Sequence, residues 1–125
     1  MTPDIRVKRI YEPADNADGA RILIDRLWPR GVRKDDAHLT VWMKDIAPSP
    51  ELRKWFDHDP ARFEEFTFRY QAELDANHAA VGQINAYVKQ GPVTLLYAAH
   101  DPVHNHAVVL ADYLKATGAA GRKAH

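Results

Sequence analysis

Four basic side chains gather in one short stretch of the sequence that holds no carboxylate. They are Arg26, Arg30, Arg33 and Lys34. The planar guanidinium group of arginine suits phosphate and carboxylate groups. We therefore expect Arg26, Arg30 and Lys34 to bind an anion. Trp28 lies between the two arginines, and its indole could stack on a ring of the ligand.

A second candidate group consists of His100, His104 and His106. Histidine is a frequent metal ligand and exchanges protons near neutral pH. On a regular helix, residues 104 and 106 lie about 200° apart around the axis, which disfavours a shared metal ion. A metal site is therefore the weaker alternative. His106 is the candidate catalytic residue, as a general acid or base, unless it only hydrogen-bonds and orders a neighbouring loop. We expect Asn105 to help bind the anion.

Both groups follow segments that read as strands. Residues 5–10 indicate an edge strand, residues 20–25 a strand covered on both faces, and residues 93–98 a buried central strand. Ligands of open α/β sheets bind outside the carboxyl ends of the strands. The order of the elements therefore predicts that the arginine loop and the residues before the last helix line one concave site.

Helix signals occupy most of the remaining chain. Residues 35–48 fit a short helix or turn, and residues 78–89 fit a longer helix. Ser49-Pro50 and Asp59-Pro60 are typical helix starts, and Asp101-Pro102 is expected to cap the last helix, which ends near Gly118. Two apolar faces are expected to be buried. They consist of Phe63, Phe66, Tyr70 and Leu74, and of Val103, Ala107, Leu110 and Leu114.

Length and composition limit the class of protein. The 125 residues, 46% hydrophobic and 27% charged, predict one α/β domain over residues 1–118, a sandwich with a small, mainly parallel sheet flanked by helices. Residues 119–125 are expected to fray. No signal peptide or membrane span is expected, and the absence of cysteine excludes thiolate chemistry, so the cytoplasm is the default location. The basic residues form no long stripe, which disfavours extended nucleic-acid binding.

Three segments carry a family resemblance. They are DGARILIDRLWPRG, WMKDIAPSPELRKWFDHDPARFEEFTFRY and TLLYAAHDPVHNHAVVLADYL. Their order and spacing resemble the short, YeaO-like branch of the family called domain of unknown function 488. The resemblance implies a small bacterial α/β protein and no established activity or cofactor. More distant, longer members carry a cysteine near the position of Asn105, so any thiol chemistry of those relatives is not possible here.

Two functional hypotheses follow. The first is an enzyme or binding protein that holds a nucleotide or phosphorylated metabolite between residues 26–34 and the start of the last helix. The second is a non-catalytic interaction protein whose arginine loop and acidic helices meet across a homodimer or bind a protein partner. The arginines could also pair with Asp57, Asp59 or Glu73 within the domain and have only a structural role.

Overall fold

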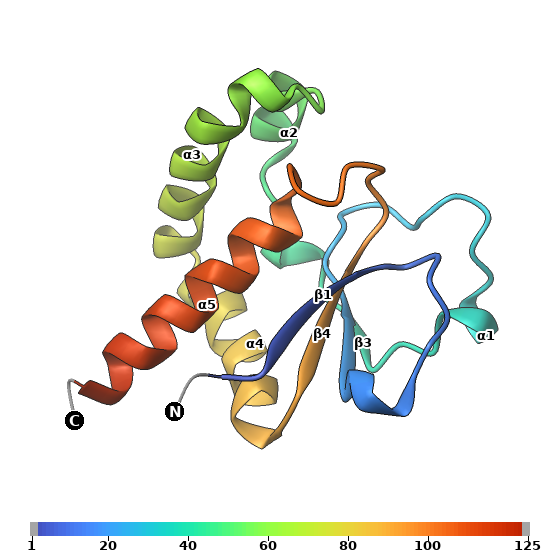
Figure 1. Ribbon diagram of the computed structural model, residues 1–125. Helices are drawn as coiled ribbons and strands as arrows, with labels where there is room; N and C mark the ends of the chain where they lie inside the picture. The colour runs from blue at the N-terminus through green and yellow to red at the C-terminus, as the bar shows by residue number, and fades with distance from the viewer. Residues whose placement is uncertain (1–2, 124–125) are drawn as a thin grey trace.

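A small parallel sheet forms the centre of the protein. The computed structural model describes residues 3–123. Its four strands lie in the order β1 (Ile5–Arg9), β4 (Val93–Tyr97), β2 (Ala20–Leu23) and β3 (Val41–Trp42), and every neighbouring pair is parallel (Figure 1). The α/β class predicted from the sequence is therefore confirmed, and the sheet is parallel throughout.

Strand β4 occupies the interior of the sheet, as its unbroken apolar run predicts. All of its residues are buried, and Leu95 pairs with Val7 of β1 on one side and with Ile22 of β2 on the other. Strands covered on both faces consist of consecutive apolar residues because neither face meets water. The expected edge position of β1 is also confirmed, since β1 pairs with β4 alone.

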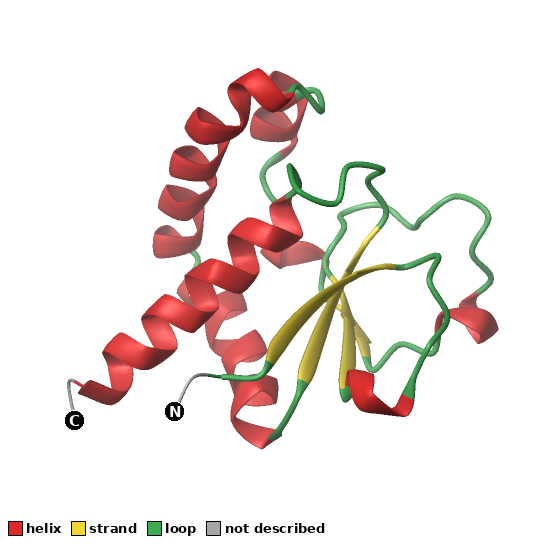
Figure 2. Ribbon diagram, viewed as in Figure 1, coloured by secondary structure: helices red, strands yellow, loops and turns green. Residues whose placement is uncertain are grey.

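The longer helices cover one face of the sheet, and loops with short helices cover the other (Figure 2). The first group comprises α2 (Pro50–Phe56), α3 (Phe63–Ala76), α4 (His78–Gln90) and α5 (His106–Lys123). Ser49 starts α2 as predicted, because its Oγ accepts a hydrogen bond from Leu52 N at 3.2 Å. No helix within residues 3–123 has the length and apolar character needed to cross a membrane.

Aromatic residues of α2 and α3 form the core beneath these helices. Phe66, Tyr70 and Leu74 are buried as predicted, whereas Phe63 is only partly buried at the rim. Phe56 of α2 stacks on Phe66 with 4.3 Å between ring centroids. This stack fixes the end of α2 against α3, which matters for the site because α2 forms one of its walls.

The segment 35–48 contains a strand that the sequence did not predict. Its chain forms the short helix α1 (Lys34–Ala37), then β3, then the 3-10 helix η2 (Lys44–Ile46). Strand β3 is only two residues long and is positioned by pairing with β2, where Thr40 N also donates to Arg21 O at 2.8 Å. A strand this short has no period of its own, so its position depends on long-range pairing.

The start of the last helix was predicted too early. Asp101-Pro102 does not cap it, because Asp101 Oδ1 accepts from Val103 N and His104 N and so closes a turn of its own. The helix begins at His106. Val103 was expected on the buried face, but it lies in this turn and is 59% exposed. Helix α5 continues to Lys123, past the predicted end at Gly118, and residues 124–125 of the expected tail lie outside the described residues.

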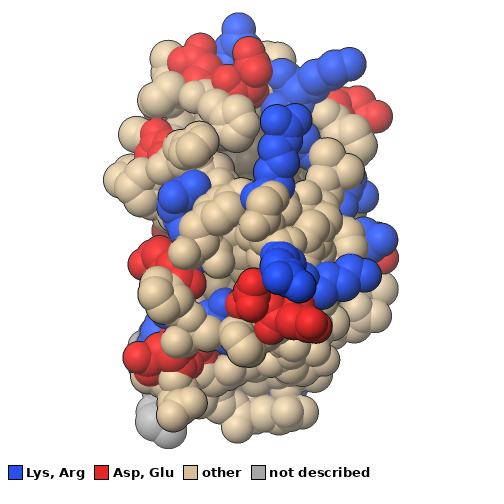
Figure 3. Space-filling view, turned by 90° about the vertical axis from the view of Figure 1, so that its right-hand side faces the viewer, with Lys and Arg blue, Asp and Glu red and all other residues tan. Residues whose placement is uncertain are grey.

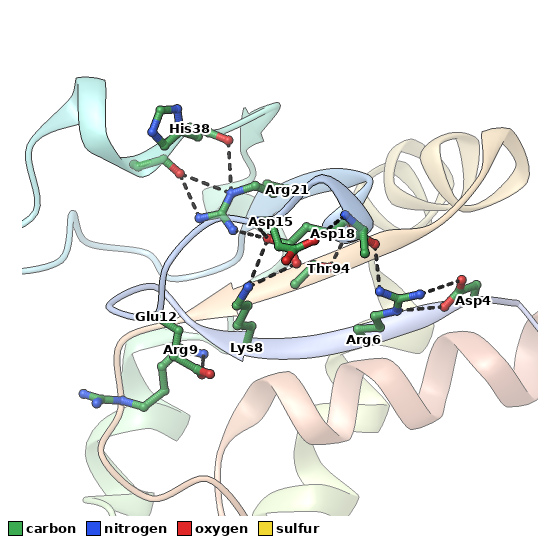
Figure 4. Close-up of polar contacts among 12 residues, drawn as sticks. Asp4, Arg6, Lys8, Arg9, Glu12, Asp15, Asp18, Arg21, His38 and Thr94 are labelled. Atoms are coloured by element: carbon green, nitrogen blue, oxygen red, sulfur yellow. Dashed lines mark hydrogen bonds and ion pairs between the residues drawn. The ribbon is translucent and has the colours of Figure 1, made fainter.

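A buried ionic cluster lies on the loop-covered face of the sheet (Figure 4). Asp18 contacts Lys8 of β1 at 3.2 Å and pairs with Arg21 of β2, while Thr94 of β4 donates to Asp18 O. Burial alone would raise the pKa of Asp18, but hydrogen bonds from Asp15 N, Arg21 and Lys8 lower it below its usual value. The cluster thus holds the 3-10 helix η1 (Asn16–Asp18) against three strands.

Candidate functional site

A cleft of about 680 Å³ opens at the carboxyl ends of β2 and β4. One wall is the loop after β2, another is the loop between β4 and α5, and a third comes from the end of α2. Viewed from its loop-covered side, the molecule has a hollow in its upper half with Lys and Arg side chains around it (Figure 3). The residues lining the cleft include Arg26, Trp28, Arg30, Asn105 and His106. The expected convergence of distant segments is therefore present.

Arg26 ties the loop after β2 to the segment before α2. Its Nη2 lies 3.3 Å from Ala47 O and 3.4 Å from Pro48 O. Its Nε is buried and has no hydrogen-bond partner among the described residues. A buried N–H without an acceptor costs free energy unless a ligand or water completes it. Arg26 therefore combines a structural contact with a buried donor that the described residues leave unpaired.

Arg30 and Arg53 present guanidinium groups that are not committed to the fold. Both residues are exposed and line the cleft, Arg30 from the loop after β2 and Arg53 from α2. Neither side chain forms an ion pair or hydrogen bond with the side chains and backbone that the structure describes. The carboxylates lining the same cleft belong to Asp25 and Asp101, so arginine predominates there.

His106 contacts the end of β2 from the first turn of α5. Its Nε2 lies 3.2 Å from Ile24 O and 3.0 Å from Asp25 Oδ1. Asp25 Oδ1 accepts no hydrogen bond, so the ring N–H is directed to Ile24 O, while Asp25 Oδ2 accepts from Ala98 N at 3.1 Å. Both neighbours of Nε2 are acceptors, which assigns the hydrogen to Nε2 and leaves Nδ1 as the nitrogen able to gain a proton.

The ring of His106 also meets a buried phenol. It stands edge-on to Tyr70, with 6.4 Å between ring centroids, and Tyr70 OH donates to Ile46 O at 2.6 Å. Burial raises the pKa of Tyr70, followed by the negative charges of Glu73 and Asp25. Tyr70 therefore stays neutral and supports the imidazole by packing rather than by charge.

Asn105 uses both ends of its amide to hold the loop between β4 and α5. Nδ2 donates to Asp101 O at 2.8 Å, and Oδ1 accepts from Val108 N at 3.0 Å. The residue is 2% exposed. Hydrogen bonds from His104 N and Val103 N lower the pKa of Asp101 in the same loop to about 2. These contacts give Asn105 a scaffolding role in the wall.

The remaining residues of the predicted anion site lie differently. Trp28 is half-buried in the wall, donates from Nε1 to Val32 O at 2.7 Å and meets Trp42 edge-on at 5.3 Å. One part of its indole still lines the cleft. Lys34 is exposed on α1 and is not among the lining residues. The structure thus brings together all the predicted site residues except Lys34.

The neighbouring histidines are spread along the cleft. His104 Nδ1 lies 2.8 Å from Asp101 Oδ2, and its ring stands edge-on to Phe63, whereas His100 is exposed. Within residues 3–123, no group of three or more His, Asp or Glu side chains is arranged to hold a metal ion. The three histidines are therefore not arranged as metal ligands in this part of the chain.

Sequence reasoning did not single out Asp25, Arg53 or His58, all of which line the cleft. Asp25 is the second residue after β2, so the rule that sites lie at strand ends could have identified it. Arg53 and His58 come from a helix end whose distance from the sheet depends on tertiary packing. No pattern in the sequence indicates that packing.

Comparisons with known proteins agree with the family resemblance of the sequence. The uncharacterized protein YeaO of Escherichia coli is 49% identical over 113 residues, which cover 90% of this chain and 97% of YeaO. An uncharacterized protein of Mycobacterium tuberculosis is 46% identical over 110 residues, covering 88% and 92% of the two chains. No solved structure matches. The family model described as the inactive DUF488-N3 subclade matches residues 4–124, and the chain belongs to this family.

Proposed function

We propose that the protein binds a small, phosphate-bearing anion in the cleft at the carboxyl edge of its sheet. The observation that carries this proposal is the presence of Arg26, Arg30 and Arg53 along one cleft, brought there from two separate segments. Guanidinium groups bind phosphate through paired hydrogen bonds.

In the part of the chain that the structure describes, these arginines form no ion pairs with the acidic residues in the middle of the chain. Asp59 lies 3.7 Å from Arg62, and Glu73 accepts hydrogen bonds from Ser49 N and Oγ. Among the described residues, no ion pair joins Arg26 or Arg30 to a carboxylate. This arrangement supports a ligand site over a purely structural arginine loop.

The apolar wall of the cleft favours a ligand with more than a bare phosphate. Leu27 and half-buried Trp28 contribute accessible apolar surface, and the buried side chains of Phe56, Phe66 and Pro29 lie behind it. A volume of about 680 Å³ suits a ligand of ordinary metabolite size. A nucleotide or a phosphorylated metabolite with a ring fits both the arginines and the apolar wall.

Binding without turnover is the simpler form of this function. The family description calls the subclade inactive, and His106 Nε2 already contacts Ile24 O and Asp25. The ordering role of His106 therefore has direct contacts in its favour. A general acid or base role would rest on Nδ1 alone, and the experiment below distinguishes the two.

The experiment is calorimetric titration with inorganic phosphate, pyrophosphate and a panel of nucleotides, supported by thermal unfolding. A ligand at a hundred times its Kd stabilises the folded state by about 2.7 kcal/mol. We expect Arg30→Ala and Arg53→Ala to weaken the best ligand roughly tenfold or more, because a hydrogen bond to a charged group contributes about 1.5–3 kcal/mol.

Arg33→Ala is the matched control, since Arg33 is an exposed arginine of the same stretch that does not line the cleft. Its affinity should equal that of the wild type. Equal losses in all three variants would indicate only a general effect of charge and would contradict the site. If no anion stabilises the protein and its melting temperature rises with protein concentration, the result would instead support a homodimer. If the wild type converts a bound anion and His106→Asn binds it without converting it, His106 is catalytic.

A further inference from the structure

Two consecutive residues after α2 adopt a left-handed backbone without being glycine. Asp57 has a φ of 50° and His58 a φ of 54°. Side chains with a Cβ disfavour this region, and such residues occur singly rather than in pairs. Glycine would adopt the same turn without that cost. Asp and His are among the residues that adopt this region more readily than others, yet the turn at residues 57–58 costs more with them than it would with glycine.

The imidazole of His58 makes no hydrogen bond or ion pair with the described residues that would explain this cost. Its ring centroid lies 6.5 Å from that of Phe56, and the residue is exposed. Its position is nevertheless distinctive, because it lines both the main cleft and a second hollow of about 440 Å³ beside α2. Arg53 is the other residue shared by the two.

We propose that His58 is an anion-binding residue of the cleft, held beside Arg53 by the left-handed turn at residues 57–58. This inference rests on the proposed function and adds a donor on the α2 wall, opposite the loop that carries Arg26 and Arg30. The second hollow also contains Lys54, Glu51 and Asp57, so its charges balance once Arg53 is included. Of the residues that the structure describes, Arg53 is the one cation that lines both hollows, and the unpaired imidazole of His58 lies beside it.

The chain contains a matched control for this residue. His38 is also an exposed histidine with a left-handed backbone, at φ 50°, and it follows α1 outside the cleft. Replacing either histidine by glycine removes an imidazole and relieves the same backbone preference. The two substitutions therefore differ only in whether the lost side chain lines the cleft.

The experiment compares the wild type, His58→Gly and His38→Gly by thermal unfolding and by calorimetric titration with pyrophosphate. We expect both variants to unfold at or above the wild-type temperature, since the strained conformation is relieved. His58→Gly should bind pyrophosphate roughly fivefold to tenfold more weakly, the loss expected for one hydrogen bond. His38→Gly should bind it as the wild type does.

A second variant guards against a change in the turn itself. Asparagine tolerates the left-handed region, so His58→Asn keeps the turn while removing the imidazole, and its affinity should also fall. Unchanged affinity in both His58 variants, with the wild type binding, would overturn this inference and leave the proposed function intact. No pyrophosphate binding by a wild type that binds another anion through Arg30 would overturn the role of His58 for phosphate. No binding of any anion would overturn both proposals.

Discussion

His106 Nε2 lies 3.0 Å from Asp25 Oδ1, which joins the first turn of α5 to the second residue after β2. The other oxygen of the same carboxylate accepts from Ala98 N at the end of β4. One carboxylate thus contacts the ends of two strands and a helix. The walls of the cleft are held together at this point.

Asp25→Ala should therefore destabilise the protein. The substitution leaves Ala98 N without its acceptor, and a buried unsatisfied donor costs about 1–3 kcal/mol. Urea unfolding followed by circular dichroism measures the change. Asp25→Asn retains an oxygen for Ala98 N and should lose less. A stability equal to that of the wild type in Asp25→Ala would show that the carboxylate does not hold the walls together.

The buried ionic cluster gives a second prediction. Asp18→Ala leaves Arg21 buried without its partner, and breaking a buried pair in this way costs about 3–5 kcal/mol. Asp4→Ala is the control, because Asp4 pairs with Arg6 at the surface, where such changes remain within about 0.5 kcal/mol. Chemical denaturation of both variants tests the contrast. Similar small losses in both would mean that water replaces the carboxylate of Asp18.

The pH dependence of stability follows from the lowered pKa of Asp18. Its hydrogen bonds favour the ionised form in the folded state, so this contribution is complete above the unfolded pKa, near about 4. It is lost as the pH falls below that value and through the lower folded pKa. We expect the stability difference between the wild type and Asp18→Asn to shrink as the pH falls below about 4.

Asp101 also has a lowered pKa, about 2, through the hydrogen bonds of its turn. An Asp101→Asn variant measured over the same range separates the two contributions. A difference between the wild type and Asp18→Asn that stays constant as the pH falls would contradict the role assigned to Asp18.

The aromatic helix α3 offers an internal comparison. Phe66 is 1% exposed and Phe68 is 69% exposed. Phe66→Ala should cost about 3–5 kcal/mol, because truncating a buried aromatic side chain removes apolar contacts and leaves a cavity. Phe68→Ala should change stability by less than about 0.5 kcal/mol. Equal effects in equilibrium unfolding would indicate that Phe68 is covered in solution by another surface.

The elements that could be predicted from the sequence are those with strong local patterns. The apolar run of β4 and the period of Phe66, Tyr70 and Leu74 are properties of neighbouring residues, and both were correct. Strand β3 depends on pairing with a distant segment. The start of α5 depends on local hydrogen bonds, because Asn105 Oδ1 rather than Asp101 accepts from the first turn of the helix at Val108 N. Asp101-Pro102 has the chemistry of a helix start, but the side chain of Asp101 is satisfied within its own turn.

The same distinction applies to the candidate site. Arg26, Arg30 and His106 could be identified because they lie in the loop after a strand or begin a helix, and strand ends meet at one edge of a parallel sheet. Arg53 and His58 reach the cleft only because the stack of Phe56 on Phe66 fixes the end of α2. The position of α2 relative to the sheet cannot be predicted from local patterns in the sequence, so neither can the place of these two residues in the cleft.

The two outer strands of the sheet have a further consequence, for self-association. An exposed strand edge can template the addition of a strand from another molecule, and short or charged edges oppose this. Strand β3 offers only two residues, and β1 carries Arg6, Lys8 and Arg9 among its five residues. Both edges therefore disfavour strand exchange between copies. A fully parallel sheet that folds slowly through distant pairings benefits from such protection while its edges are exposed.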